Sequence, residues 1–522
     1  MPIIQTSEIT QSTRLAPNTG LQVYCGLDCG VTIEVREELG RLFNETPEIY
    51  NFERALQGPY LEIMLRGFRV DQIARSRAAS ELRSRIERLE RTLNQMATAV
   101  WHQPLNPRSP KQLTQFFYRA MGLPEVWLSQ KGERKLSTNR EALEKLEVYL
   151  HARPIIACIL SIRDLAKQLQ VFDTDIDADG RFRTSYNIAG TETGRPSSSE
   201  NAFGTGGNAQ NIAPGLRYVF VADPGWKLVV IDLEQVEARD VGFFCGCLFN
   251  NWEFLDACES GDLHTNNARR IWPELNWTGD NKKDRAIADR NFYREFSYRD
   301  MAKRGSHLSN YYGTAWTASR HLKVPIAMME EFQARYIRGR LARPGQAAIE
   351  PAYPAIAEYW QWVATELQTT HQLTTPFGRR RHFFGRPGDD TTLREAIAFL
   401  PQSTTADRMN LGLWRVWKHM PHAQLLAQTY DSVTFQVREG PGFDDAVAEA
   451  LQLIADIPLY GPNGRRYAVP GEAKVGYNWG NMHDPRKAIG PGNRFNPDGL
   501  VKWSPGADRR ARANGLQRIM EG

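Results

Sequence analysis

The sequence has few cysteines and no long run of apolar residues. Six cysteines in 522 residues are too few and too irregularly spaced for a disulfide framework. Cys245 and Cys247 have no matching second pair, so a zinc site is not expected. No apolar run approaches the ~18 residues of a membrane-spanning helix, and residues 1–14 lack the apolar centre of a signal peptide. We therefore expect a soluble, cytoplasmic protein in a reducing compartment.

The net charge of the chain excludes few classes of function. Lys and Arg number 65 against 60 for Asp and Glu, a formal net charge of +5. This mild basic excess permits nucleic-acid binding without requiring it. The length allows several domains or one large enzyme of several lobes, and no internal repeat divides the chain.

One short apolar stretch ends in an aspartate. Leu228–Ile231 are four consecutive apolar residues, which predict a strand buried on both faces, and Asp232 follows them. The simpler interpretation is a turn aspartate, because turns favour this residue. A carboxylate at the end of a buried strand is costly, however, unless a partner such as a metal ion offsets its charge.

A second segment presents another aspartate in the same way. Tyr430-Asp431-Ser432 lies between two strand-like runs, and the residues that follow alternate apolar and polar up to Val437. This alternation predicts a half-buried strand. Two aspartates, each presented by its own strand, could hold two divalent ions between them, as in two-metal phosphoryl transfer.

Helical patterns occupy much of the remaining chain. Residues 55–71 predict a helix that ends near Gly67, and residues 74–99 predict one long amphipathic helix. The charged face of the long helix is either a solvated surface or a contact with DNA phosphates. Ser109 and Ser137 begin segments that are typical of capped helix starts.

Three other segments have a distinctive composition. Thr191–Ile212 is a polar loop rich in Gly, Ser and Asn, and residues from about 250 to 425 are expected to form helices and loops. The tail from about Asp484 is rich in Pro, Gly and Arg, which predicts a weakly ordered basic extension. His264 is a candidate hydrogen-bond donor to a phosphate, although a single histidine more often has a structural role.

The segment Arg299–Gly313 has basic or aromatic residues at every fourth position. If it is helical, Lys303, His307 and Tyr311 follow Arg299 around one face. Cations four residues apart on a helix repel each other, so this spacing indicates an anionic partner such as a triphosphate. The alternative is an exposed basic face.

In this order, the motifs resemble those of the family A DNA polymerases, the DNA polymerase I superfamily, and most of all its bacteriophage members. DLEQVEAR (232–239) resembles motif A, residues 299–313 resemble motif B, and TYDS (429–432) resembles motif C. TGRPSS, NAQNI, FGRRR and PQSTTAD also match in order, and SPKQL with STN matches the thumb. The likeness covers roughly residues 20–482. Each motif alone is weak evidence for the family, whereas the full set in this order is highly specific for it.

The resemblance implies an α+β right-hand polymerase fold with an antiparallel-sheet palm, helical fingers and a helical thumb. The implied reaction adds deoxynucleotides to the 3′-hydroxyl of a primer, with primer–template DNA and dNTPs as partners. The expected boundaries are a vestigial exonuclease-like segment at 1–65, the thumb at 66–170, the palm at 171–248 and 396–484, the fingers at 249–395, and a basic extension at 485–522.

The resemblance also implies residues that bind metal and nucleotide. Two Mg²⁺ ions would be bound by Asp232, Asp431 and the backbone carbonyl of Leu233. The nucleotide-binding set is Gln235, Glu237, His264, Arg299, Lys303, His307 and Tyr311. In that set, Lys303 would also be the general acid toward the leaving pyrophosphate. Glu237 would block a ribose 2′-hydroxyl.

Contacts with duplex DNA are implied for a further set of polar residues. Their donors would face minor-groove acceptors and phosphates, which read the shape of DNA and not its sequence. The set is Thr193, Arg195, Asn208, Gln210, Asn211, Arg217, Arg379, Gln402 and Tyr430. The alternative for some of these residues is a role in capping loops.

The chain departs from the family pattern in motifs B and C. Tyr430-Asp431-Ser432 stands where relatives have His-Asp-Glu, so the glutamate is missing. Tyr312 stands where a glycine usually follows the tyrosine, which makes Tyr311 and Tyr312 alternatives for stacking on the templating base. His307 and Leu308 are further departures. Because both metal aspartates and the basic pair remain, we predict an active enzyme.

The first part of the chain resembles a fragment of a 3′–5′ exonuclease. Tyr24–Asp28 matches its last motif, whereas its other carboxylates would lie before residue 1. We expect no proofreading unless a separate exonuclease polypeptide completes that site. Two other functions remain open. One is a single-subunit RNA polymerase, against which Glu237 argues, and the other is a DNA-binding subunit that has lost catalysis.

Overall fold

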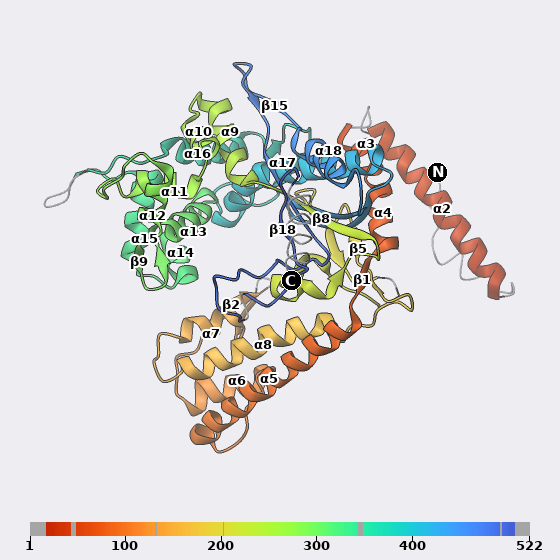
Figure 1. Cartoon of the computed structure of the whole chain (residues 1–522). Coiled ribbons are helices and arrows are strands. Elements are labelled where there is room, and N and C mark those ends of the chain that lie inside the picture. Colours follow the sequence, from red (N-terminus) through yellow and green to blue (C-terminus); the bar gives the residue numbers. More distant parts are fainter. Residues whose placement is uncertain are drawn as a thin grey trace, which may run out of the picture.

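The computed structural model describes residues 17–42, 48–130, 133–201, 203–342, 348–490 and 493–506. A five-stranded sheet lies at its centre, between a long helical arm and a larger helical region (Figure 1). The predicted segments at 1–16 and 507–522 lie outside the described residues. No helix within these ranges has the length and apolar character that crossing a bilayer requires.

The central sheet joins strands that are far apart in the sequence. Its order is β13-β14-β8-β17-β18, and all neighbours are antiparallel. The strands are β8 (Trp226–Leu233), β13 (Gln424–Thr429), β14 (Ser432–Arg438), β17 (Gly471–Gly476) and β18 (Val501–Lys502). The strand that carries Asp232 is therefore the middle strand, next to the one that follows Asp431.

Apolar side chains cover both faces of β8. Val229 and Ile231 belong to one core, and Leu228 and Val230 belong to the other. These four residues are at most 9% exposed, so the prediction of a strand buried on both faces is confirmed. Because side chains alternate along a strand, Asp232 points to the same face as Val230.

The prediction that the second strand is half-buried is wrong. Thr434 and Gln436, the polar residues of the alternation, are 0% and 1% exposed. Burial of Gln436 is possible because its amide donates to Asp223 and to Gln424, both at 2.7 Å. The alternation in β14 therefore separates two buried faces and does not mark a solvated one.

The arm is built on two long helices that pack along each other (Figure 1). Its elements are α5 (Gln72–Trp101), α6 (Pro110–Thr114), the π-helix η1 (Gln115–Ala120), β2 (Trp127–Gln130), β3 (Glu133–Leu136), α7 (Arg140–Leu146) and α8 (Arg153–Asp173). The predicted long helix is α5, which begins because the Asp71 carboxylate accepts two backbone N–H groups. Ser109 caps α6 as expected, whereas Asn139, and not Ser137, caps α7.

The larger helical region follows β8. Its elements are α9 (Val236–Phe249), α10 (Glu253–Glu259), α11 (Leu263–Ile271), α12 (Asn281–Ala288), β9 (Asn291–Tyr293), β10 (Phe296–Ser297), α13 (Tyr298–Asn310), α14 (Ala315–Leu322), α15 (Ile326–Gln333), the π-helix η4 (Ala334–Arg338), α16 (Pro354–Thr369), β11 (Gln372–Thr374) and β12 (Arg380–His382). Two further helices, α17 (Asp390–His419) and α18 (Phe443–Ala455), pack against the sheet on the side of Val229 and Ile231.

Shorter elements surround the sheet. They are α2 (Pro17–Leu42), α3 (Glu48–Ala55), α4 (Gln57–Arg66), β1 (Phe68–Val70), β4 (Arg181–Phe182), β5 (Ser185–Asn187), β6 (Ser197–Ser199), the 3-10 helices η2 (Ala209–Asn211) and η3 (Pro214–Val219), β7 (Phe220–Val221), β15 (Leu459–Tyr460) and β16 (Arg466–Tyr467). The helix predicted near Gly67 is α4, which ends at Arg66. Tyr24 and Asp28, the exonuclease-like pair, are exposed on α2, which projects from the rest of the fold (Figure 1).

The prediction of a weakly ordered tail is wrong for the residues described before Gly506. Val501 pairs with Val475, so β18 extends the central sheet. Arg494 donates to Glu81 on α5 at 2.8 Å and lies over the ring of Tyr218. The tail therefore connects the edge of the sheet to the arm.

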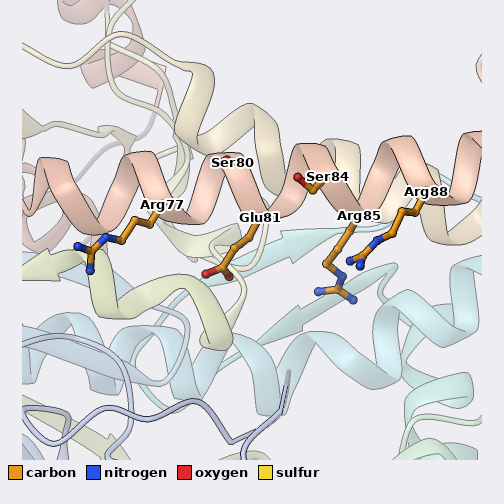
Figure 2. A pocket seen from close by; sticks show the side chains of 6 residues that line it. All are labelled: Arg77, Ser80, Glu81, Ser84, Arg85 and Arg88. Carbon is orange, nitrogen blue, oxygen red and sulfur yellow. The ribbon is translucent and has the colours of Figure 1, made fainter.

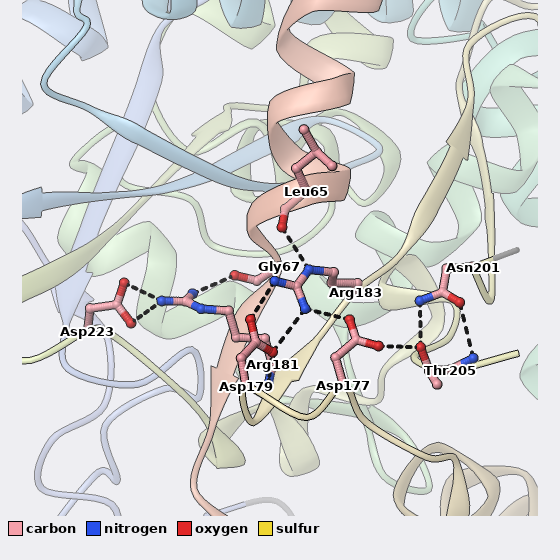
Figure 3. A network of polar contacts seen from close by, with 9 residues as sticks. All are labelled: Leu65, Gly67, Asp177, Asp179, Arg181, Arg183, Asn201, Thr205 and Asp223. Carbon is pink, nitrogen blue, oxygen red and sulfur yellow. Dashed lines mark hydrogen bonds and ion pairs between the residues drawn. The ribbon is translucent and has the colours of Figure 1, made fainter. Parts of the chain in front are cut away.

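A network of arginines and aspartates fixes the polar loop 191–212 to the end of α4 (Figure 3). Arg183 donates to the carbonyl of Leu65 at 2.7 Å and to Asp177 at 2.5 Å, and Thr205 of the loop donates to the other oxygen of Asp177. Although burial opposes it, hydrogen bonds from Thr205 and Arg183 lower the pKa of Asp177. The loop is thus held to the end of α4 through Asp177 and Arg183.

Candidate active site

The two predicted metal aspartates lie together at one end of the central sheet. Asp232 pairs directly with Ser432 across β8 and β14, and Asp431 is the preceding residue. The amide of Leu233 donates to the carbonyl of Asp431 at 3.1 Å. Tyr430 adopts a positive φ of 54°, which closes the two-residue turn between β13 and β14. Strand register therefore brings together two carboxylates that are 199 positions apart in the sequence.

The electrostatics of this pair favour a bound cation. Burial, together with the charge of Asp431, raises the pKa of Asp232 to about 7. Burial also raises the pKa of Asp431, and the charge of Glu237 adds to this effect. Two half-buried carboxylates that repel each other bind a proton more tightly than usual, and a divalent ion would relieve the same repulsion.

The donor set fits Mg²⁺. This ion prefers oxygen ligands and is usually bound through one or two carboxylates, with water and substrate phosphates completing its shell. Asp232 and Asp431 meet that description. Across the described ranges, no three Asp, Glu, His or Cys side chains gather closely enough to form a metal site on their own.

A chain of contacts joins motifs A, B and C beside the aspartates. The hydroxyl of Tyr311 donates to one oxygen of Glu237 at 2.5 Å. Arg195 donates to the other oxygen, and its guanidinium lies 6.0 Å from the ring centre of Tyr430. The Tyr430 hydroxyl in turn donates to Asn211 at 3.3 Å. Four of the predicted nucleotide- and DNA-binding residues are thus connected to Glu237.

The structure distinguishes Tyr311 from Tyr312. The helix of motif B, α13, ends at Asn310, so the expected helical row does not continue to Tyr311. Tyr312 adopts a positive φ of 60°, the conformation that glycine favours, and its ring packs edge-on against Trp360. Tyr311 packs against His307, with ring centres 5.5 Å apart, and faces Glu237. Tyr311 is therefore the tyrosine at the site.

The arginine of motif B already has a counter-charge within the protein. Arg299 makes a two-pronged ion pair with Asp262, with both contacts at 2.9 Å. Arg285 binds the same carboxylate at 2.9 Å. Although burial opposes it, the hydrogen bond from Arg299 lowers the pKa of Asp262. Lys303, one turn along α13, is exposed.

Two of the predicted nucleotide-binding residues carry buried polar atoms without a partner. These atoms are Nδ1 of His264 and Oε1 of Gln235. Burial, together with Arg299 and Lys303, lowers the pKa of His264 to about 4, so its ring is neutral at pH 7. Because buried polar groups are normally hydrogen-bonded, these two atoms are suited to meet a ligand or water.

Two of the predicted DNA-binding residues are buried and hydrogen-bonded within the protein. Gln210 is 9% exposed, and its amide donates to the carbonyl of Pro196 at 3.1 Å and to Gln428 at 3.4 Å. Arg379 is also 9% exposed, and its guanidinium donates to Asp407 and Glu53. The N–H groups of both side chains donate to other groups of the protein, so these residues hold neighbouring segments of the site together.

The other predicted DNA-binding residues are more accessible. Asn211 is exposed, whereas Thr193 and Asn208 are half-buried in the loop 191–212. Arg217 lies over the ring of Trp479 at 4.4 Å, and burial lowers its pKa. Gln402 is half-buried on α17. Asn208 also caps η2, so the loop-capping alternative applies to it.

A basic groove runs along α5 of the arm. Figure 2 shows Arg77, Arg85 and Arg88 on the same side of the helix, with Glu81 between them. Arg494 of the tail pairs with Glu81, which removes the acidic contribution from this surface. The groove is suited to a polyanion, which favours the nucleic-acid interpretation of the charged helix face.

The sequence interpretation missed a buried cluster beneath motif A. Asp240 on α9 accepts hydrogen bonds from Tyr467 at 2.8 Å, Thr405 at 3.0 Å and Arg408 at 3.2 Å. Asp240 and Arg408 are both 0% exposed, and burial raises the pKa of Asp240. Asp240 lies one residue beyond the quoted motif, but nothing in its local sequence identified distant partners.

The fold is similar to that of the polymerase domain of Pol1 from M. smegmatis, which was solved in complex with DNA primer-template and dNTP. The TM-score is 0.63 at 22% sequence identity, over 82% of this chain and 69% of that chain.

The family follows from the sequence match. Residues 74–481 match DNA polymerase family A, and the chain belongs to this family. Its relatives include the thermostable DNA polymerase I of Thermus filiformis, 27% identical over 81% of this chain and 47% of that protein. DNA polymerase I of Helicobacter pylori (strain ATCC 700392 / 26695) is 25% identical over 75% of this chain and 40% of that protein. The chain spans about half the length, or less, of these curated relatives.

Proposed function

We propose that the chain is a DNA-directed DNA polymerase that extends a primer 3′-hydroxyl with deoxynucleotides copied from a template. The observation that carries this proposal is the convergence of Asp232 and Asp431 at one end of the sheet, beside Glu237 and Tyr311. Family membership supports the same activity. In this proposal the central sheet is the palm, α10–α16 form the fingers, and the arm is the thumb.

Different residues of the site would have different roles in the reaction. Asp232 and Asp431, with the carbonyl of Leu233, would hold two Mg²⁺ ions, which when bound activate the 3′-hydroxyl and neutralise charge on the phosphates. The 3′-oxygen bonds to the α-phosphorus while the bond to pyrophosphate breaks. Lys303, which is exposed on α13, would donate a proton to the departing pyrophosphate.

The incoming triphosphate is held by the basic face of α13. Arg299 is fixed by Asp262 and therefore presents a pre-oriented guanidinium. His264 is neutral at pH 7, so one ring nitrogen donates and the other accepts. Glu237, held from both sides by Arg195 and Tyr311, is proposed to exclude a ribose 2′-hydroxyl.

Primer extension tests the proposal. Wild-type chain should extend a primed template with dNTPs and Mg²⁺, and Asp232→Ala and Asp431→Ala should each reduce the rate by at least about 10³-fold. Glu449→Gln, an exposed change on the far side of α18, is the control. A protein that binds DNA without catalysis would show no extension in any variant. An RNA polymerase would prefer rNTPs when both nucleotides compete.

The lack of proofreading, the bacteriophage resemblance and any separate exonuclease partner stay predictions. The first can be measured directly. Purified chain incubated with a mismatched primer and Mg²⁺, without nucleotides, should leave the 3′ end intact. Shortening of the primer that survives in Asp232→Ala would show that the chain has its own exonuclease site.

A further inference from the structure

A buried asparagine lies behind the loop that carries Arg195. The side chain of Asn410, on α17, is 2% exposed. Its amide nitrogen donates to the backbone carbonyl of Gly194 at 3.1 Å, and its amide oxygen accepts from the hydroxyl of Tyr60 at 2.7 Å. Tyr60 lies on α4 and is 1% exposed. Asn410 therefore joins α4 and α17 to the residue that precedes Arg195.

The same glycine packs against a second buried group. A Cβ at Gly194 would lie only 2.5 Å from Cζ of Arg379, so the absence of a side chain allows this close approach. The guanidinium of Arg379 donates to Asp407 on α17 at 2.7 Å and to Glu53 on α3 at 2.5 Å. Because Asp407 is on the same helix as Asn410, α17 supports the backbone of Gly194 at two points.

A closed turn connects this support to Arg195. The N–H of Gly194 donates to the carbonyl of Thr191 at 3.2 Å, and the hydroxyl of Thr191 donates to the carbonyl of Arg195 at 2.7 Å. The side chain of Arg195 then reaches Glu237 and binds its carboxylate. A displacement of Gly194 would move the guanidinium of Arg195, because the two residues are neighbours in one hydrogen-bonded turn.

We propose that Asn410 is a positioning residue for Glu237. It holds Gly194, and thereby the guanidinium of Arg195, at the position from which Glu237 is fixed. This inference rests on the proposed function, in which Glu237 excludes a ribose 2′-hydroxyl. It also gives α4 a role in the site, although Tyr60 precedes residue 74, where the match to the family begins.

Single-nucleotide insertion on a primed template tests this inference in the full chain. Asn410→Asp keeps the shape and the acceptor for Tyr60, but it places an oxygen against the carbonyl of Gly194. The ratio of kcat/KM for dCTP to that for CTP should then fall about fivefold. Tyr60→Phe, which leaves the amide oxygen of Asn410 without its donor, should lower the ratio less. The control Tyr118→Phe removes a buried hydroxyl that donates to Ser137 in the arm, and it should keep the wild-type ratio.

A double variant separates positioning from a general loss of stability. General damage to the fold would lower kcat/KM for both nucleotides and leave the ratio unchanged, which would overturn the inference. In Glu237→Ala, adding Asn410→Asp should not lower the ratio further, because no carboxylate is left to position. An additive loss would also overturn it. If Glu237→Ala itself keeps the wild-type ratio, the gate of the proposed function is wrong, and the inference is wrong with it.

Discussion

The hydroxyl of Tyr311 donates to the carboxylate of Glu237 at 2.5 Å, and this bond joins the end of α13 to the first turn of α9. Arg195 holds the second oxygen of the same carboxylate. Glu237 is thus fixed by a residue from each of two other motifs. A fixed carboxylate can exclude a hydroxyl group, because it cannot move aside without losing two charge-assisted hydrogen bonds.

Glu237→Ala should weaken the discrimination between deoxynucleotides and ribonucleotides. Removal of the side chain opens space for a 2′-hydroxyl, and a change of about 1–3 kcal/mol corresponds to roughly 10–200-fold. The measurement is the ratio of kcat/KM for dCTP and CTP on a primed template. Tyr311→Phe, which removes only the hydroxyl, should cause a smaller loss. An unchanged ratio in Glu237→Ala would exclude the proposed gate.

The metal-free chain should lose stability as the pH rises from 5 to 8. The pKa of Asp232 is about 7 in the folded state and near 4 when unfolded. The folded state therefore binds more protons in this range, and its free energy of unfolding falls as they dissociate. Thermal melting in EDTA should show a smaller fall for Asp431→Asn, because one repelling charge is gone. Mg²⁺ should raise Tm more at pH 8 than at pH 5.

Asp240→Asn should destabilise the fold by about 3–5 kcal/mol. Asp240 and Arg408 are both fully buried, so the substitution leaves a buried cation without its counter-charge. Tyr467→Phe removes one neutral donor from the same carboxylate and should cost only about 1 kcal/mol. Urea unfolding of the two variants measures the difference. Equal effects would mean that the charge of Asp240 contributes nothing.

Substitution of two glycines in the polar loop should show the cost of backbone strain apart from the cost of a steric clash. Gly204 and Gly206 have φ values of 74° and 71°. A Cβ at Gly206 would lie 1.8 Å from the carbonyl oxygen of Arg183, whereas one at Gly204 meets nothing within 4 Å. Gly204→Ala should therefore cost about 1 kcal/mol from φ alone, and Gly206→Ala clearly more. Urea unfolding and DNA affinity should both follow this order.

Predictions that depended on local pattern agree best with the structure. The run 228–231 lies in the middle strand of the sheet, and the amphipathic segment 74–99 lies in α5. In both cases, the signal is the spacing of apolar residues along a short segment, and this spacing reflects which side chains are buried. The errors in β14 and in the tail arise because neither the alternation nor the composition of a segment shows which distant segments pack against it.

In the candidate site, too, local motifs were predictable from the sequence and contacts between distant segments were not. The sequence predicted roles for the aspartates, Glu237 and the basic helix, because each lies within a recognisable local motif. It did not identify Asp262 as the partner of Arg299, or Asp407 and Glu53 as the partners of Arg379. Such ion pairs join residues of different segments, so no local pattern reports them.

The sequence by itself determined which segments become strand or helix, where two carboxylates end strands, and the family to which these motifs belong. Only the tertiary structure decided that Asn410 contacts Gly194, that Tyr60 contacts Asn410, and which arginines remain available for a ligand. The physical reason is that charge and burial depend on neighbours in space. Strand register and helix packing set those neighbours across hundreds of residues of chain.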